Sequence, residues 1–582
     1  MLAKLHHFIT EGCSEGGRTG PWLALGLLAA AIPGAKALTQ AFSGPYVVQD
    51  DARQFVVWMA RFEDPALFRG DFIADYFNAV TPYGFTALYW GAAQLGLDPM
   101  VFNKLLGPGL ALLTVIFAFR LTIMLTPIPV AGFLVASLLS IDLWLNDSLA
   151  SGTPRAFVYP LFLAFLYAVA RRTVAGTVVA IALQGLFYPQ IALVSAGVLV
   201  LRLLRWQGGP RLSRRRADWF LLAAGLLAAA VTLAPFMLKT GAYGPGLTLG
   251  EAKTLPGLQP GGRTFFFDDD LWHFYLCALR SGYLPREWGC GTVLQQAPAM
   301  LAPYFVALAA AVWALPIWLW RRGHKGAEVL VCVLVSSTVL FVTAHALLFE
   351  LHLPSKYSQQ PLRMITAVAL GAALASVLTG AMKRTRWRGA AVTGTALLVI
   401  GLLILPLVHA RIPKTRYVES QHPAVHVFLK GQPKDSLVAS LMKEANSLPA
   451  FSRMSVLVAN EFMIPYSRGY ARMFDERARA LILAHYSPDP APLKELIGHY
   501  GVDLFLIDER SFRIGDVRRS WWAVHYPAAA KAALAVLARG DKPAFMDFIE
   551  SCSIFEDRST TVLSAACILE RLRKDVNRGG QP

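Results

Sequence analysis

Apolar stretches separated by short polar segments fill the chain from residue 21 to residue 409. A stretch of about 20 apolar residues can span a bilayer as a helix. We place about eleven such segments, at residues 21–38, 101–124, 129–144, 156–170, 173–188, 190–204, 218–238, 299–319, 328–350, 362–382 and 390–409. Those at 129–144, 156–170 and 173–188 are short for a bilayer. The pattern predicts a polytopic α-helical membrane protein.

The pattern changes after residue 410 to that of a small soluble α/β domain. Residues Ser455–Val458 and Val502–Ile507 have the continuous apolar character of buried strands, whereas 475–485 and 492–500 have helical spacing. Alternating strands and helices favour a sheet with helices packed on it. We therefore expect a membrane domain at 1–410, with external loops at 39–100 and 239–299, followed by a domain at 411–582.

Lys and Arg gather in alternate loops, which predicts the orientation. These loops hold sixteen basic side chains against Asp218 alone, at Arg120, Arg171–Arg172, Arg202–Arg216, Arg321–Lys325 and Lys383–Arg388. The opposite loop at 239–299 is balanced, with five basic and five acidic side chains. Because basic residues are enriched in cytoplasmic loops, we expect a cytoplasmic N-terminus, and residues 411–582 on the outer, periplasmic face of the inner membrane.

Composition supports the membrane setting. The chain is 55% hydrophobic and 16% charged, with a mean hydropathy of +0.45, outside the range of soluble domains. The net charge of +17 is nearly all in the basic loops, so it reflects topology and not a nucleic-acid partner. A rival interpretation makes residues 22–37 a cleaved signal peptide, because Ala35-Lys36-Ala37 resembles a cleavage site. Either choice leaves the later segments in the same orientation.

The first external loop carries the most informative charges. Adjacent carboxylates, Asp50 and Asp51, follow the first apolar segment, and Arg53 comes two residues later. Residues 55–62 are aromatic and apolar on one side, which predicts a helix lying on the membrane surface. Since carboxylates at the lipid boundary are costly unless they have a function, the pair is a candidate general base for a lipid-linked substrate.

Further cations and amides stand at the outer ends of later spans. Arg155 begins the fourth span, where the charge rule disfavours an arginine, and Asp142 lies in the span before it. Arg155 either holds a phosphate or reaches the lipid headgroups. A second group lies in the segment 353–363, at Lys356, Tyr357, Gln359, Gln360 and Arg363. Such donors suit a diphosphate or a phosphosugar.

A second acidic cluster lies in the loop 239–299. Asp268, Asp269 and Asp270 are followed by His273, with aromatic residues on both sides. The cluster is either a site for a divalent metal ion or a sugar, or a solvated turn, because a metal needs oxygen ligands from different segments. Asp142 is a further candidate metal ligand. No phosphate-binding glycine loop, HExxH or CxxC motif is present.

Four cysteines fall on the predicted outer side as two pairs. Cys277 and Cys290 share one loop, and Cys552 and Cys567 share the tail. Even pairs on an oxidising side predict disulfides.

Three short motifs resemble those of the GT-C superfamily of membrane glycosyltransferases, in particular aminoarabinose transferases and protein O-mannosyltransferases. Asp50-Asp51-Ala52-Arg53 is similar to the D-[ED]-x-R start of their first external loop. The segment from Asp75-Tyr76-Phe77 to Pro82-Tyr83-Gly84 resembles their Y-F-x-x-P-x-G motif, and Lys356-Tyr357 resembles an R-Y pair before a late span. The lysine expected after Tyr-Phe is absent, which leaves the donor and acceptor open.

The resemblance implies that Asp50 acts as the base and that Arg53 contacts a polyprenyl phosphate. It therefore implies an inverting transferase that moves a sugar from a polyprenyl-phosphate donor to a lipid, glycan or protein acceptor. Two alternatives are a transporter or flippase for a lipid-linked glycan, which predicts charges in mid-span and internal repeats, and a non-catalytic assembly subunit. The latter leaves the Asp50–Arg53 group without a purpose.

Overall fold

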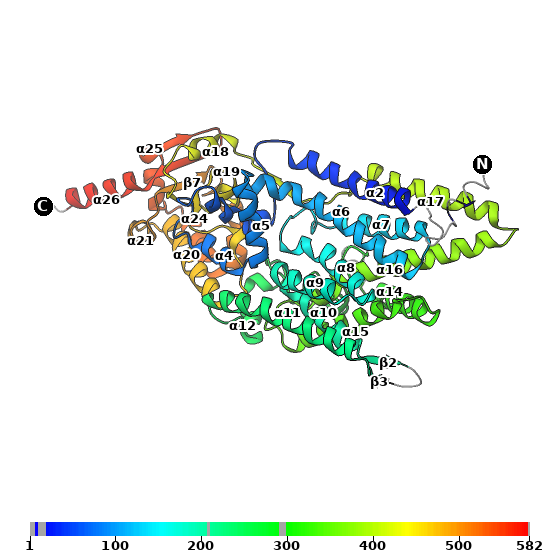
Figure 1. Ribbon diagram of the computed structural model, residues 1–582. Coiled ribbons are helices and arrows are strands. Elements are labelled where there is room, and N and C mark those ends of the chain that lie inside the picture. Colours follow the sequence, from blue (N-terminus) through cyan, green and yellow to red (C-terminus); the bar gives the residue numbers. More distant parts are fainter. Residues whose placement is uncertain (1–5, 8, 10–18, 207–209, 290–297, 580–582) are drawn as a thin grey trace.

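The computed structural model describes residues 6–7, 9, 19–206, 210–289 and 298–579. Each of the eleven predicted spans is a helix there. Seven are long and apolar enough to cross a membrane: α2 (Thr19–Ala41), α6 (Pro99–Leu125), α11 (Arg216–Thr240), α14 (Pro298–Arg321), α15 (Ala327–Ala346), α16 (Ser355–Lys383) and α17 (Arg388–Val408). The protein is a multi-pass membrane protein, and Figure 1 shows these helices as one bundle.

The other four helices are shorter: α7 (Pro129–Trp144), α8 (Val158–Ala170), α9 (Val174–Phe187) and α10 (Pro189–Leu201). At 1.5 Å per residue, 13 residues reach only about 20 Å, against a hydrocarbon core of about 30 Å. The exact number of spans therefore stays a prediction. Helix α7 is buried along most of its length and packs against α2, α6 and α16, so it forms the centre of the bundle.

The loop at 39–100 folds over one end of the bundle. It contains β1 (Val47–Gln49), α3 (Ala52–Phe55), the 3-10 helix η1 (Val57–Phe62), α4 (Phe72–Val80) and α5 (Tyr83–Gln94). Strand β1 pairs antiparallel with β4 (Tyr417–Glu419), which follows the last membrane helix. This pairing joins the loop to the C-terminal part of the chain just before Asp50, whose backbone N–H donates to the carbonyl of Arg416 at 3.2 Å.

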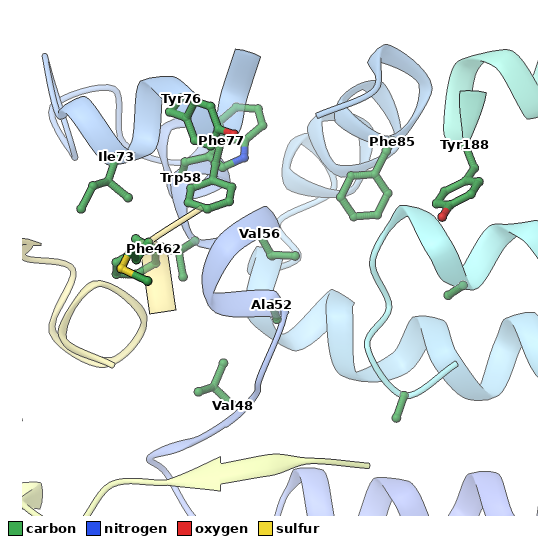
Figure 2. Packing of buried hydrophobic residues seen from close by; sticks show 14 of the residues in the cluster. Val48, Ala52, Val56, Trp58, Ile73, Tyr76, Phe77, Phe85, Tyr188 and Phe462 are labelled. Atoms are coloured by element: carbon green, nitrogen blue, oxygen red, sulfur yellow. The ribbon is translucent and has the colours of Figure 1, made fainter. Parts of the chain in front are cut away.

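The prediction that residues 55–62 lie on the membrane surface is wrong. Val57, Trp58 and Met59 are at most 7% exposed, and they belong to the same core as Phe77 and Phe462 (Figure 2). The apolar side of this segment is covered by protein, because α4 and the C-terminal region fold over it. The same pattern of hydrophobic residues suits burial against either lipid or protein, and the sequence alone did not distinguish the two.

The C-terminal region has the predicted α/β character. Its five-stranded sheet has the order β6-β5-β7-β9-β8: β6 (Ser455–Val456), β5 (Leu437–Ala439), β7 (Leu504–Asp508), β9 (Thr560–Ser564) and β8 (Ser553–Glu556). β5 is parallel to both neighbours, whereas β9 is antiparallel to β7 and to β8. Two predicted strands are β6 and β7, and the two predicted helices are α20 (Arg468–Tyr486) and α21 (Ala491–Tyr500).

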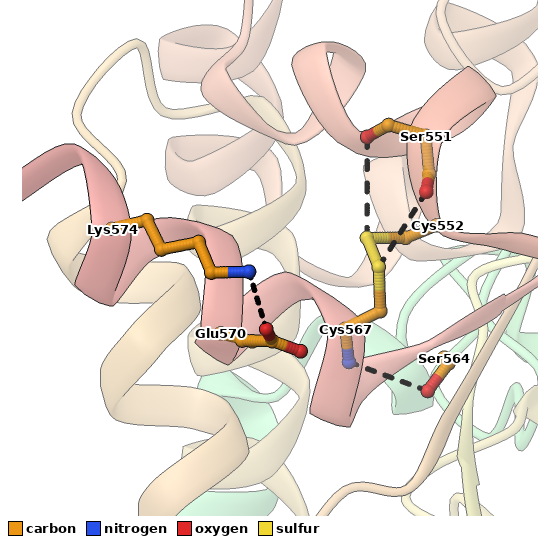
Figure 3. Close-up of a disulfide and its surroundings, with 6 residues drawn as sticks. All are labelled: Ser551, Cys552, Ser564, Cys567, Glu570 and Lys574. Carbon is orange, nitrogen blue, oxygen red and sulfur yellow. Dashed lines mark hydrogen bonds and ion pairs between the residues drawn. A yellow bond between two sulfur atoms is a disulfide. The ribbon is translucent and has the colours of Figure 1, made fainter.

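Further helices surround this sheet: α18 (Pro423–Lys430), α19 (Leu448–Ser452), α22 (Ile514–Arg519), α23 (Trp521–His525), α24 (Pro527–Ala538), α25 (Ile549–Cys552) and α26 (Ala565–Gly579). A disulfide joins Cys552 to Cys567, with 5.5 Å between the Cα atoms, and it links α25 to the start of α26 (Figure 3). Cys277 is buried. Cys290 lies outside the described residues, so the pair Cys277–Cys290 stays a prediction.

The loop at 239–299 forms a third layer beside these two parts. It contains η3 (Gly241–Tyr243), α12 (Leu249–Thr254), η4 (Pro256–Leu258) and the π-helix η5 (His273–Cys277). Its small apolar core includes Leu258 and Phe266 and extends to Phe349, just before α16. The loop therefore reaches both the bundle and the C-terminal region, whose Arg468 binds Glu251 of the loop at 2.7 Å.

Candidate active site

The carboxylates of the first loop lie where three parts of the protein meet. Asp50 follows β1, and Arg53 is in the first turn of α3, so the two side chains share one face and form an ion pair. Arg53 is 6% exposed and also binds Glu461 at 2.8 Å. Arg53 therefore bridges the first loop and the C-terminal region.

Glu461 was not singled out in the sequence. It lies in the 3-10 helix η7 (Asn460–Phe462) after β6, and Arg263, from the loop at 239–299, binds it at 2.5 Å. Gln54 donates to the backbone carbonyl of Glu461 at 2.7 Å. Burial raises the pKa of Glu461 to about 7, although Arg263 and Arg53 oppose that rise. In the sequence, the feature that could have identified Glu461 is that it is the single carboxylate within the apolar run 456–464.

The second carboxylate of the pair faces a different arginine. Asp51 forms an ion pair with Arg155, which lies in the short 3-10 helix η2 (Pro154–Phe157) that precedes α8. Arg155 also binds Asp147 at 3.0 Å, and Arg416 approaches Asp147 at 3.6 Å and Asp50 at 3.9 Å. Burial raises the pKa of Asp51, and Arg155 opposes the rise. Asp147 and Arg416 were also missed in the sequence.

The loop that presents Arg155 is fixed by close packing against α6. Asn103 donates to the carbonyl of Ser151 at 2.9 Å and to the hydroxyl of Tyr89 at 3.1 Å. Gly152 has a φ of +55°, and a Cβ there would lie 2.5 Å from the amide nitrogen of Asn103. Only glycine fits this approach without strain. The position of Arg155 is thus set by the backbone and not by a flexible loop.

Lys356 lies beside this group, and none of the described carboxylates pairs with it. Its charge interacts with those of Arg155, Arg280, Asp51 and Asp147, but within the described ranges no carboxylate comes within 4.0 Å of it. Burial, together with the charges of Lys356 and Arg280, lowers the pKa of nearby His352 to about 3. His352 is therefore neutral, and it does not offset or add to the positive charge here.

We name this group the junction cluster: Asp50, Asp51, Asp147, Glu461, Arg53, Arg155, Arg263, Arg416 and Lys356. It contains five cations and four carboxylates, contributed by the first loop, the loop before α8, the loop at 239–299, the start of α16 and the C-terminal region. The structure thus brings together four of the predicted site residues with Arg53. Carboxylates at its centre can accept a proton, and the surplus cation can hold an anion.

The remaining residues of the 353–363 segment form a separate group. Arg363 binds Asp142 at 3.0 Å and also pairs with Glu287, and the indole of Trp288 donates to Asp142 at 2.8 Å. We name Arg363, Asp142 and Glu287 the inner triad. Its single cation is already matched by two carboxylates. The neighbouring Tyr357 is buried, and its hydroxyl donates to the carbonyl of Leu351 at 2.8 Å.

Gln360 and Tyr76 have packing partners of their own. Gln360 is 8% exposed and lies near Tyr188, and its side-chain oxygen has no hydrogen-bond partner among the described residues. The ring of Tyr76 stacks on Tyr470 with 3.6 Å between the centroids, and its hydroxyl lies 3.4 Å from that of Ser467. Tyr76 therefore holds α4 against the C-terminal region, instead of extending into the junction cluster.

The candidate metal ligands do not converge. Asp268 binds the ring of His273 at 2.5 Å, and Asp270 accepts hydrogen bonds from the backbone N–H groups of Trp272 and His273. These contacts are those of a turn leading into η5, and no partner of Asp269 was found in the described residues. Across those residues, no group of three His, Cys, Asp or Glu side chains could hold a metal ion.

Comparison with known proteins identifies the fold. No family model and no curated protein sequence matches the chain. The oligosaccharyltransferase AglB from Archaeoglobus fulgidus, solved with an inhibitory peptide and a dolichol-phosphate, superposes with a TM-score of 0.52 at 11% identity, over 87% of this chain and 72% of that one. Its apo form gives 0.50 at 10% identity, over 86% and 71%.

A further similar structure is ArnT from Cupriavidus metallidurans bound to undecaprenyl phosphate, with a TM-score of 0.45 at 13% identity, over 94% of this chain and 98% of that one. The predicted GT-C fold is confirmed by the similarity to AglB, a GT-C membrane glycosyltransferase. At this level of identity the likeness establishes the fold alone.

Proposed function

We propose that this protein is a glycosyltransferase that moves a sugar from a polyprenyl-phosphate donor to an acceptor on the outer, periplasmic face of the inner membrane. The observation that carries the proposal is the junction cluster: paired carboxylates beside a half-buried lysine with no carboxylate partner among the described residues. Transfer from a lipid phosphate needs a base for the acceptor hydroxyl and positive charge for the departing phosphate. The cluster offers both.

The base is better assigned to Asp51 than to Asp50. The carboxylate of Asp50 accepts a hydrogen bond from Arg53, and Arg53 also forms an ion pair with Glu461. Arg416 lies 3.9 Å from the same carboxylate of Asp50. Burial raises the pKa of Asp51, and a carboxylate with a raised pKa binds a proton more readily. This assignment departs from the one implied by the sequence motif, in which the first aspartate is the base.

The phosphate of the donor is assigned to Lys356 and Arg155. Both charges interact with Asp51, so a phosphate between them would place the sugar next to the base. Arg155 already forms ion pairs with two carboxylates. Lys356 forms none with the described carboxylates, so its charge would be stabilised most by an incoming anion. Arg53 acts through Asp50 and Glu461 and holds the first loop in place.

The proposal is tested in a strain that lacks this chain. Mass spectrometry of its glycolipids, glycans and glycoproteins should show a missing sugar, and its membranes should accumulate a polyprenyl-phosphate sugar. The wild-type gene should restore the product, and so should a control variant, Asp541→Asn, which changes a carboxylate paired with Arg539 on the surface. An unchanged sugar profile in every fraction would contradict the proposal.

A further inference from the structure

A cavity of about 230 Å³ lies at the start of α6, and no residue of the junction cluster or the inner triad lines it. Its walls come from the segment around β1, from η1, from the first turns of α6 and from α18 and α19. The lining is mixed. Apolar side chains include Val47, Val57, Met100 and Phe451, and charged side chains are also present.

Three cations and one carboxylate line this cavity. Arg453 is neutralised, because it binds Glu63 at 3.0 Å and Asp98 at 3.1 Å. Lys104 and Lys430 form no ion pair within 4.0 Å in the part of the chain that the structure describes, although the charge of Lys104 interacts with that of Asp98. Their ammonium groups instead lie 4.8 Å and 5.0 Å from the ring centroids of Phe42 and Tyr46, respectively. The cavity therefore has a net positive charge, which two lysines supply.

The cavity lies at an edge of the membrane-spanning part. Lys104 is in the second turn of α6, and Val101 and Leu105 beside it on the same helix are 39% and 44% exposed. Phe42, at the end of α2, is 50% exposed. Exposed apolar side chains on a spanning helix face lipid tails, and a lysine near its end extends toward the headgroups. The headgroup of a lipid bound here would thus meet a lysine, and its acyl chain would meet apolar side chains.

We propose that this cavity binds the phosphate headgroup of an anionic phospholipid from the adjacent leaflet. Lys104 and Lys430 contact the phosphate, and the acyl chains lie along Val101 and Leu105. Each lysine near an anionic lipid contributes about 1 kcal/mol, which is about fivefold in affinity. The site shares no cation with the junction cluster, so it is independent of the proposed transferase activity.

The test is a lipid titration of the delipidated full-length protein in neutral detergent, followed by native mass spectrometry. The probes are phosphatidylglycerol, phosphatidylcholine and inorganic phosphate. Lys104→Gln/Lys430→Gln should weaken binding of phosphatidylglycerol by about 30-fold, and each single variant by about fivefold. The control Lys542→Gln/Lys574→Gln removes the same charge from exposed lysines that pair with Asp547 and Glu570, and it should bind like the wild type.

Several results would overturn the proposal. They are equal affinities in the two double variants, equal affinities of the wild type for phosphatidylglycerol and phosphatidylcholine, or displacement of the lipid by inorganic phosphate at similar concentration. The last result would assign the site to a free phosphate. If the double variant fails to fold, the two single variants decide the question by the same criterion.

Discussion

The junction cluster and the inner triad are both built from arginines and carboxylates, but their charge balance differs. In the inner triad Arg363 faces two carboxylates, and the indole of Trp288 adds a further donor to Asp142. In the junction cluster five cations face four carboxylates, and Lys356 has no acidic partner within the described chain. The cation of the inner triad is fully matched by carboxylates, whereas the junction cluster has one positive charge in excess.

This difference assigns them different functions. An anion entering the inner triad would add a third negative group around one arginine, whereas in the junction cluster it would neutralise the surplus cation. A buried charge set whose members are all matched serves structure, and losing one member leaves its partners uncompensated. We therefore expect substitutions in the cluster to change activity and substitutions in the triad to change stability.

The largest effect is expected at the proposed base. Asp51→Asn keeps the size of the side chain but removes the base, so sugar transfer should fall by about 10²–10⁴-fold. Asp50→Asn should cost less, because Asp50 positions Arg53. The measurement is the rate of product formation in membranes from the complemented deletion strain, normalised to the amount of protein. If Asp51→Asn keeps full activity while Asp50→Asn loses it, the base is Asp50 instead.

Arg363→Met should destabilise the protein by about 3 kcal/mol, because the half-buried carboxylates of Asp142 and Glu287 lose the buried cation that they share. Unfolding in detergent, followed by circular dichroism, measures the loss. Adding Asp142→Asn and Glu287→Gln to the same chain should recover most of it. A stable Arg363→Met variant that has lost transfer activity would move the phosphate site to the inner triad.

Lys356→Gln is the matching change in the junction cluster. It should lower kcat/KM for the donor by about 10- to 100-fold, which is the value of a hydrogen bond to a charged group. Its melting temperature should stay at or above that of the wild type, because no ion pair is lost. An unchanged kcat/KM, or a marked drop in melting temperature, would show that Lys356 is a structural residue.

A smaller effect is expected on the pH dependence of stability, through the titration of Glu461. Burial raises its pKa from 4.5 to about 7, so in this range the folded protein holds a proton that the unfolded chain has released. The stabilisation is complete below about pH 4.5 and is lost as the pH rises through about 7. The melting temperature should fall more steeply between these values in the wild type than in Glu461→Gln. Glu556→Gln, at an exposed strand end, is the control and should match the wild type.

The sequence predicted most of the fold but only part of the site. Apolar length located every membrane helix that the structure describes, because a span is a local property of the chain. Lys356 and Arg155 were recognised because their charges stand out beside apolar segments. Glu461 and Arg263 were missed, because their importance comes from contacts between residues 198 positions apart.

The surroundings of residues 55–62 likewise depend on contacts with distant parts of the chain. A one-sided apolar pattern shows that Val57 and Trp58 are buried, but not whether lipid or Phe462 covers them. Likewise, Arg363 and Lys356 lie seven positions apart in one helix and look equivalent in the sequence. Only the carboxylates of Asp142 and Glu287, brought from other segments, distinguish them.

If a lipid phosphate binds at the junction cluster, photo-cross-linking should locate it there. The purified full-length protein is mixed with a polyprenyl phosphate that carries a photoreactive group next to the phosphate, and with the corresponding polyprenol as a control. After irradiation, peptide mapping should place the phosphate-dependent label in residues 145–155 and 352–357, and Lys356→Gln should reduce it. Phosphate-dependent labelling confined to residues 284–289 or 363–367 would instead place the lipid phosphate at the inner triad.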